Sequence, residues 1–276
     1  MKKKGNPGTV FLYIILIGAA AATVYPFLWM VSASFKPLKE IVSGKMSLFS
    51  HNMSLANYKY IFGRSSLFPR WFLNSFMVAL IGTMVNIFIN TMAGYSLSRL
   101  SFPGRNKIYH CLLTLMMVPS QVLLIPNYLI LQGLGLLDSY FALVLPAAAN
   151  IGYIFLMRQF FMNFPKEVEE AASIDGLGRY SRFFRICMPL ARPTIATQAI
   201  FIFMGFWNEF TKPMLYMKTA SKYTLTLGLQ SFQSQNAGTM WHQVMAAASI
   251  SVFPIIIIYL IFNKYFLVGV RMDGEK

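Results

Sequence analysis

Acidic residues and the side chains used in metal or redox chemistry are scarce in this sequence. Its 276 residues include nine Asp and Glu, three His and two Cys. Cys111 and Cys187 lie in or beside apolar segments without the spacing of metal ligands, so we expect buried thiols. His51, His110 and His242 are isolated, with no nucleophile or ligand cluster around them. These absences argue against a membrane-embedded enzyme and predict no catalytic residue and no metal site.

A phosphate-binding loop is also missing, because no G-x-x-x-x-G-K-[ST] pattern occurs. The short sequence Gly176-Leu177-Gly178 follows no predicted strand and is a poor substitute. We therefore expect no bound nucleotide and no other cofactor on this chain. Signatures of nucleic-acid-binding folds are absent as well, so the net charge of +15 does not indicate a nucleic-acid partner.

Long apolar segments dominate the rest of the sequence. Apolar residues make up 56% of the chain, charged residues 12%, and the mean hydropathy is +0.54, values that indicate an integral membrane protein. Six apolar segments follow one another, at about residues 10–31, 72–97, 108–131, 140–157, 194–210 and 244–262. The sequence predicts an all-α polytopic membrane protein with a transmembrane domain over residues 10–262.

Basic residues at the ends of these segments set the expected orientation. With residues 1–9 and 263–276 in the cytoplasm, fifteen of the 24 Lys and Arg lie on the cytoplasmic side and nine on the other. Cytoplasmic connections of membrane proteins carry such an excess, beside anionic lipid headgroups. We expect six transmembrane helices with both termini in the cytoplasm.

Prolines and amides interrupt several segments. Pro119, Gln121 and Pro126 predict a broken third helix, which is tolerated where protein or a water-filled cavity satisfies the freed backbone groups. We expect Gln121 to line a polar pathway, together with Asn150 and Asn208 from later segments.

Other polar residues of the segments leave two interpretations open. Asn74, Asn86 and Asn90 are expected to share hydrogen bonds with neighbouring helices, with a ligand site as the alternative. Glu209, at the end of the fifth segment, is either a functional acid or half of an ion pair with Lys212.

Residues 165–193 form a charged stretch between the fourth and fifth segments. Pro165 suits a first helical position, and three glutamates follow in the first turn, where the helix dipole favours negative charge. Gly176 suits the left-handed residue that ends a helix. These signals predict a helix over residues 166–175, a turn and a second short helix.

The order of residues in this stretch resembles the EAA loop of ATP-binding-cassette (ABC) importer permeases. Glu170-Ala171-Ala172 is followed by Gly176 and then by I-C-M-P at residues 186–189. The likeness extends over almost the whole chain and is nearest to the smaller permease of maltose, multiple-sugar and raffinose importers. It rests further on N-S at 74–75, S-R at 98–99, F-P-G-R at 102–105, L-L-I-P at 123–126, G-L-L-D-S at 135–139, R-Q-F-F at 158–161 and W-N-E-F at 207–210.

This resemblance implies the ABC type I importer permease fold, with six transmembrane helices and a cytoplasmic coupling helix within residues 165–193. The coupling helix of relatives docks on an ATPase. The residues that would do so here are Glu167, Glu170, Ala171, Ala172, Asp175 and Gly176. In relatives the external loop before the last span reaches toward a binding protein. The residues of this chain that would do so are Gln230, Gln233 and Gln235.

The resemblance also implies a set of partners and a location. The partners are a second, larger permease subunit in a heterodimer, two cytoplasmic ATPase subunits that hold ATP and Mg, and an extracellular sugar-binding protein. The location is the lipid bilayer of a bacterial plasma membrane. Residues 269–276 depart from the small-residue end of many relatives, so no contact of this tail with the ATPase is implied.

The predicted function is a non-catalytic permease subunit of an ATP-driven importer of a sugar, expected to be an oligosaccharide. The chain would form half of the translocation pathway. One alternative is an ABC importer permease for a solute that is not a sugar. Another is an ion-coupled secondary transporter, although the interiors of the six segments lack the charged residues that such a protein generally needs.

Overall fold

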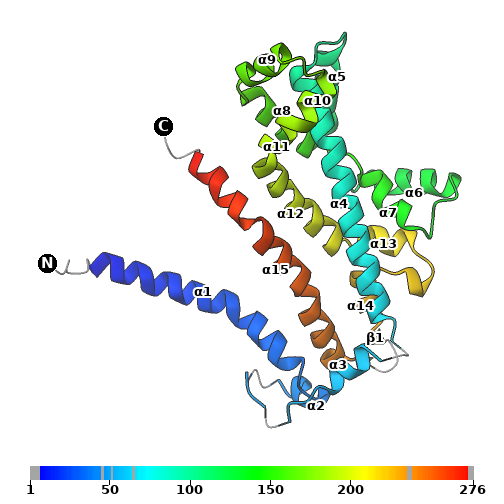
Figure 1. Ribbon diagram of the computed structural model, residues 1–276. Coiled ribbons are helices and arrows are strands. Elements are labelled where there is room, and N and C mark those ends of the chain that lie inside the picture. Colours follow the sequence, from blue (N-terminus) through cyan, green and yellow to red (C-terminus); the bar gives the residue numbers. More distant parts are fainter. Residues whose placement is uncertain (1–6, 45–46, 51, 64–65, 235–237, 273–276) are drawn as a thin grey trace. The chain divides into compact units, whose positions relative to one another are not determined.

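The computed structural model describes residues 7–44, 47–50, 52–63, 66–234 and 238–272. Helices form nearly all of the regular structure in these residues, which are drawn in Figure 1. The chain divides into two compact units. The first consists of residues 1–69 and 228–253, and the second of residues 70–227 and 254–276.

The first unit contains three helices, a small strand pair and parts of three longer elements. The complete helices are α1 (Pro7–Ala33), α2 (Leu38–Val42) and α3 (Ala56–Ile61). The strands β1 (Gln233–Ser234) and β2 (Gly238–Thr239) pair antiparallel, with Gln233 opposite Thr239. The unit also holds the start of α4 (Phe68–Arg99), the end of α14 (Leu225–Gln230) and the first part of α15 (Trp241–Met272).

Asn57 connects α3 to the segment that follows α1. Its side-chain amide donates to the carbonyls of Ser34 and Lys36, at 2.8 and 3.0 Å. Asn57 and Ile61 are the buried residues of α3, so one side of this short helix faces inward. Lys36 is itself buried, and its Nζ donates to the Ser47 carbonyl at 2.5 Å.

The second unit is built around the long helix α4 (Phe68–Arg99). The elements that follow along the chain are α5 (Arg105–Leu115), α6 (Leu124–Gly133), α7 (Tyr140–Val144), η1 (Leu145–Ala147), α8 (Ile151–Asn163), α9 (Lys166–Ile174), α10 (Arg179–Arg182), the π-helical turn η2 (Phe183–Cys187), α11 (Met188–Leu190), α12 (Arg192–Asn208), α13 (Thr211–Tyr216), η3 (Ala220–Lys222) and α14 (Leu225–Gln230).

Two glycines of α4 allow other helices to approach it closely. A Cβ atom on Gly94 would lie 2.5 Å from Cβ of Met157 and 2.8 Å from the backbone nitrogen of Arg158. A Cβ atom on Gly82 would lie 2.6 Å from the ring of Phe206. Small residues at such contacts are typical of membrane helices, because close backbone approach supplies much of their packing. These two positions bring α8 and α12 against α4.

Three described helices are long and apolar enough to cross a membrane: Gly8–Ala33, Phe68–Arg99 and Trp241–Phe262. Two bent pairs of helices would each complete a further span. They are Tyr140–Ala147 with Ile151–Asn163, bent by 45°, and Arg179–Leu190 with Arg192–Asn208, bent by 74°. By length and composition the described residues thus offer three to five spans, against the six expected from the sequence.

The predicted third span consists of two separate helices. The segment 116–123 divides α5 from α6, and Pro119 and Gln121 lie within it. The break expected from these residues is therefore present. Since α5 and α6 are each too short to span a bilayer alone, this segment accounts for the difference between the five spans and the expected six.

Candidate functional site

Arg99 and Glu169 meet in the interior of the second unit, at the C-terminal end of α4. Nε of Arg99 lies 3.1 Å from Oε1 of Glu169, and only 8% and 12% of the two side chains are exposed. Arg99 also donates to the carbonyl of Phe164, the residue that ends α8. This ion pair therefore joins the long helix α4 to α9, and the same arginine joins α4 to the end of α8.

Further groups complete the buried cluster around Glu169. The Tyr95 hydroxyl donates to Oε2 of Glu169 at 3.4 Å, and Arg182 of α10 donates to the Glu169 carbonyl at 3.5 Å. The Tyr95 ring packs on Phe161 and Phe183, with centroids 5.4 and 5.1 Å apart. Burying a carboxylate is costly unless it is paired and hydrogen-bonded. The cluster therefore determines which face α9 turns inward.

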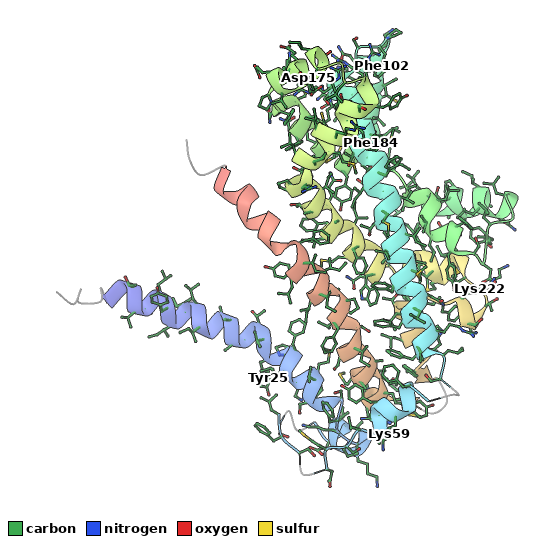
Figure 2. The ribbon with its side chains drawn as sticks, in the orientation of Figure 1. Tyr25, Lys59, Phe102, Asp175, Phe184 and Lys222 are labelled. Carbon is green, nitrogen blue, oxygen red and sulfur yellow. The ribbon has the colours of Figure 1, made fainter. Side chains whose placement is uncertain are left out.

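The opposite face of α9 is open. Glu169 and Ala172, which share a face at i, i+3 spacing, are the buried residues of this helix. Ile174 is 87% exposed, so nearly all of its apolar side chain is left uncovered by this chain. We call the exposed residues of this helix and its end the α9 surface: Lys166, Glu167, Val168, Glu170, Ala171, Ser173, Ile174 and Asp175. Figure 2 shows Asp175 and Phe102 at the same end of the second unit.

Gly176 ends α9 as predicted. Its φ is +78°, in the left-handed region that glycine adopts without strain. The amide of Gly176 bonds the Ser173 carbonyl at 3.1 Å, and the amide of Leu177 bonds the Ala172 carbonyl at 3.0 Å. These bonds satisfy carbonyls that a helix end would leave unpaired. A second helix, α10, follows after the turn.

The six predicted coupling residues differ in their exposure. Glu167, Glu170, Ala171, Asp175 and Gly176 are exposed, whereas Ala172 faces inward with 3% of its surface exposed. Sequence reasoning did not single out Arg99 or Glu169. The signal that could have found Glu169 is its i, i+3 spacing from Ala172, because a small buried residue marks the inner face of a helix.

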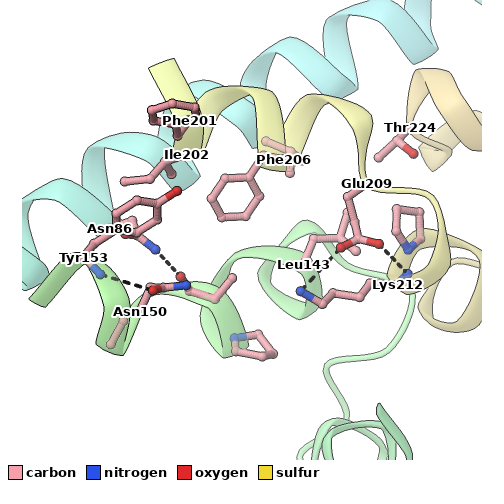
Figure 3. Close-up of a pocket in the computed structure, with 16 residues that line it drawn as sticks. Asn86, Leu143, Asn150, Tyr153, Phe201, Ile202, Phe206, Glu209, Lys212 and Thr224 are labelled. Atoms are coloured by element: carbon pink, nitrogen blue, oxygen red, sulfur yellow. Dashed lines mark hydrogen bonds and ion pairs between the residues drawn. The ribbon is translucent and has the colours of Figure 1, made fainter. Parts of the chain in front are cut away.

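A cavity of about 280 Å³ lies within the second unit, away from α9. Its walls come from α4, α12, α13 and the bent pair formed by α7, η1 and α8, as Figure 3 shows. Its polar lining residues are Asn86, Asn150, Tyr153, Glu209, Lys212 and Thr224. The residues of this cavity are far apart in the sequence, so only the fold brings them together.

The backbone is broken where the bent pair meets this cavity. Asn86 donates to the carbonyl of Ala147, and Asn90 donates to the side-chain oxygen of Asn86. Oδ1 of Asn90 accepts from the backbone amide of Asn150 at 3.0 Å. Asn150 in turn caps α8, because its Oδ1 accepts from the amide of Tyr153 at 3.3 Å. The two asparagines of α4 thus satisfy the backbone groups that the break frees.

The expectation that amides of the second segment bond to neighbouring elements is confirmed. Asn86 and Asn90 are buried and bond the broken backbone. Asn74 donates to the carbonyls of Ser221 and Tyr223, at 3.0 and 2.9 Å. All three amides therefore have a structural role in joining α4 to its neighbours.

Glu209 forms an ion pair with Lys212, which was one of the two interpretations of this residue from the sequence. Its Oε2 lies 3.5 Å from Nζ of Lys212. Its Oε1 accepts from the backbone amides of Thr211 and Lys212, at 3.0 and 3.3 Å, and so caps the start of α13. The carboxylate is therefore balanced in charge at the edge of the cavity, as Figure 3 shows.

Of the three predicted pathway residues, only Asn150 lines this cavity. Gln121 is exposed in the segment between α5 and α6, and Asn208 is exposed at the end of α12. Tyr153, Phe206 and the ion pair of Glu209 were missed as lining residues, because their approach to Asn150 depends on tertiary structure.

The loop residues predicted to face a binding protein lie near the start of segment 228–253, which belongs to the first unit. Gln230 is exposed at the end of α14, and the backbone of Gln233 belongs to β1. Gln235 lies outside the described residues. Their role stays a prediction.

The two thiols differ in their surroundings. Cys187 is buried as expected, whereas Cys111 is exposed. The expectation of a second buried thiol was wrong because α5 buries none of its residues within this chain. In the described residues no group of three or more His, Cys, Asp and Glu could hold a metal ion, and His51 lies outside them.

The fold and these features define a helical, multi-pass membrane permease. A broken span lines an internal cavity, and a short amphipathic helix outside the long spans is fixed by a buried ion pair. The family model described as "Binding-protein-dependent transport system inner membrane component" matches residues 86–272. The chain belongs to this family, the permeases of ABC transporters, as the sequence resemblance predicted.

Curated relatives cover essentially the whole chain. It is 31% identical over 281 residues to the arabinooligosaccharides transport system permease protein AraQ of Halalkalibacterium halodurans, with all of both chains covered. It is 32% identical over 274 residues to the sn-glycerol-3-phosphate transport system permease protein UgpE of Yersinia pestis, with 97% of each covered.

A solved structure shows the same fold. It is a bacterial ABC transporter involved in the import of the acidic polysaccharide alginate, and one of its chains superposes with a TM-score of 0.84. The match covers 96% of this chain and 100% of the other at 23% identity. As a member of this family, the permease is a component of the plasma membrane and is not itself catalytic. In this family ATP is bound by a partner ATPase.

Proposed function

We propose that this chain is the smaller permease subunit of an ATP-driven oligosaccharide importer and that its α9 surface docks on a cytoplasmic ATPase subunit. The observation that carries this proposal is the contrast between the two faces of α9, one buried and ion-paired and the other exposed. Glu169 fixes the inner face, while Ile174 and three acidic residues are left exposed on the outer face. Exposed apolar residues rimmed by charge mark surfaces for protein partners.

The chemistry of the α9 surface defines its partner. The exposed acids Glu167, Glu170 and Asp175 would pair with basic side chains, and Ile174 would enter an apolar groove. A helix of this kind binds by placing its apolar residue in a groove of the partner. ATP-driven closure of the two ATPase subunits would displace α9 and, through Arg99, the helix α4.

An oligosaccharide is the proposed substrate because relatives across the whole chain are named as oligosaccharide permeases. We further propose six spans with both termini in the cytoplasm, a heterodimer with a larger permease, and a binding protein that approaches Gln230 and the residues after it. The relative named for sn-glycerol-3-phosphate supports a second candidate, an importer of an organic phosphate. The family match sets aside the ion-coupled secondary transporter.

The docking proposal is tested by Ile174→Asp in the complete complex. The Ile174 side chain is almost fully exposed, so the substitution leaves the fold of this chain intact. We expect the ATPase to be lost from the purified complex and ATP-driven uptake to fall to background. The matched control is Val42→Asp, at an exposed apolar residue of α2. Normal ATPase association and uptake in Ile174→Asp would contradict the proposal.

The substrate proposal needs a separate measurement. Vesicles with the wild-type complex and its binding protein would be supplied with labelled arabinotriose, maltotriose or glycerol 3-phosphate, with and without ATP. We expect ATP-dependent uptake of an oligosaccharide. Uptake of glycerol 3-phosphate alone would favour the second candidate, and uptake driven by an ion gradient without ATP would contradict both.

A further inference from the structure

The cavity beside the broken helix pair carries an inference about what this subunit itself binds. It lies between α4, α12 and the segment around Asn150, and all of its lining residues belong to the second unit. Irregular backbone inside a membrane is tolerated where it is buried in protein or lines a polar cavity, and substrate sites of transporters form beside such breaks. The break at residues 148–150 fits this pattern.

Two hydrogen-bonding groups of the cavity are not used by the protein. Asn150 employs its Oδ1 as the cap of α8, and its backbone amide bonds Asn90. Among the described residues, neither the side-chain nitrogen of Asn150 nor the hydroxyl of Tyr153 has a hydrogen-bond partner. Both residues line the cavity. A ligand with hydroxyl groups would satisfy these two donors.

Apolar walls face these polar groups. Phe206, Phe201 and Ile202 line the cavity from α12, opposite the segment that carries Asn150. A sugar ring has an apolar face of C–H bonds and a rim of hydroxyls, so it requires both kinds of wall. Small-molecule pockets usually have about 300–1,000 Å³. This cavity, with about 280 Å³, fits one sugar residue of a longer chain.

The charge of the cavity selects among saccharides. Glu209 and Lys212 are its charged lining residues, and they pair with each other at 3.5 Å. No cation among the lining residues is left to balance an added carboxylate. A uronic acid residue would bring a second negative charge near Glu209, and that charge would also have to lose its water.

We propose that this cavity is a subsite of the smaller permease that binds one neutral glycosyl residue of the transported oligosaccharide. Asn150 and Tyr153 donate hydrogen bonds to its hydroxyls, and Phe206 contacts its ring. This assignment rests on the proposed function of the chain in oligosaccharide import. It adds a binding site on this subunit and a preference for neutral over acidic sugars.

Gly205→Leu tests the subsite by filling it. Gly205 lines the cavity, and a Cβ atom added there would meet no atom within 4 Å, so the new side chain enters open space. We expect ATP-dependent uptake of arabinotriose to fall at least about tenfold, equivalent to a loss of about 1.4 kcal/mol in transition-state binding. The matched control is Gly133→Leu on α6, where the added Cβ is also unobstructed. It should transport as wild type.

Tyr153→Phe removes one donor without changing the packing of the ring. Losing a single hydrogen bond of about 0.5–1.5 kcal/mol predicts a two- to tenfold rise in the KM for uptake. Asn150→Ser keeps a capping oxygen for α8 and withdraws the amide, so it should raise KM while the complex stays assembled. ATPase association, measured on the same preparations, should match wild type for all of these variants.

The acidic probe is trigalacturonate, offered to the same vesicles. We expect wild type to prefer arabinotriose and Gly205→Leu to abolish that uptake. If Gly205→Leu and Tyr153→Phe both transport arabinotriose as wild type does, the subsite is refuted while the proposed function stands. Preferred uptake of trigalacturonate would refute the neutral assignment. If wild type moves no saccharide with ATP, the proposed function itself fails.

Discussion

Arg99, the last residue of α4, and Glu169, in the middle of α9, form a buried ion pair with 3.1 Å between Nε and Oε1. The same helix α4 carries Asn86 and Asn90, which hold the broken backbone at the cavity. One continuous helix therefore contacts both the proposed docking helix and the proposed sugar subsite. In the proposed coupling, a displacement of α9 would act on α4 at Arg99.

The ion pair should be needed for stability and for coupling. Removing one partner of a buried pair leaves an uncompensated charge and costs about 3–5 kcal/mol. We expect Arg99→Ala and Glu169→Ala each to lower the thermal unfolding temperature of the purified complex, and to reduce uptake per ATP hydrolysed. The double variant Arg99→Glu with Glu169→Arg should recover part of the unfolding temperature and part of the uptake per ATP hydrolysed. Lys39→Ala, at an exposed charged residue of α2 away from the α9 surface, should leave the unfolding temperature unchanged.

The bond from Asn90 to Asn150 should stabilise the bent helix pair. Asn90→Leu removes the acceptor of the Asn150 amide, and the loss of one such hydrogen bond costs about 0.5–1.5 kcal/mol. We expect a lower unfolding temperature and faster amide hydrogen exchange at residues 148–151. Asn163→Leu is the control, at an exposed asparagine. Equal exchange in both variants would show that the break needs no support from α4.

Gly94 should tolerate no larger residue. A Cβ at this position would meet the backbone of α8 at 2.8 Å, and backbone cannot turn aside as the end of a side chain can. We expect Gly94→Ala to separate α4 from α8 and to lower the yield of folded protein in the membrane. Gly18→Ala in α1 meets no atom within 4 Å and should be neutral or stabilising, by up to about 1 kcal/mol. A similar loss of folded protein in Gly94→Ala and Gly18→Ala would rule out close packing at Gly94 as the cause.

Asp138 should make the turn before α7 sensitive to acid. Hydrogen bonds from the backbone amides of Thr219 and Lys218, from the Thr219 hydroxyl and from Lys222 lower its pKa below the ordinary value. With a lowered folded-state pKa, the stabilisation is complete above the unfolded-state pKa of about 3.9 and is lost as pH falls below it.

The measurement is hydrogen exchange of residues 136–139 and 217–222 at different pH values. We expect protection in wild type to weaken below about pH 4. Asp138→Asn should show weak protection at every pH, since the amide replaces an ionised acceptor and cannot pair with Lys222. Wild-type protection that is flat down to pH 2, or equal protection in the variant, would contradict this account.

Local signals in the sequence predicted several features correctly. Helix α9 and its end at Gly176 follow from acidic residues in a first turn and a glycine after the last. The break in the third segment follows from Pro119 in an apolar run. The pair of Glu209 with Lys212 follows from i, i+3 spacing. Each of these depends on residues close together in the chain.

Features that depend on distant segments were beyond local reasoning. A helix of nine residues presents several possible faces, and nothing local in the sequence identified the face that turns inward. That face contains Glu169, because Arg99 lies 70 positions earlier in the chain and meets it only after folding. The cavity is a similar case, since Asn150 was predicted but its partners on α12 and α13 were not.

The exposed Ile174 has a consequence for how cells must produce this protein. In the docking proposed above, a subunit made without its ATPase would leave this side chain uncovered, together with the exposed Tyr180 of α10. Exposed apolar patches favour aggregation and capture by proteases and chaperones. Synthesis of the permease and the ATPase in matched amounts would therefore protect the permease. Permease made in excess of the ATPase would stay unassembled and would be removed sooner.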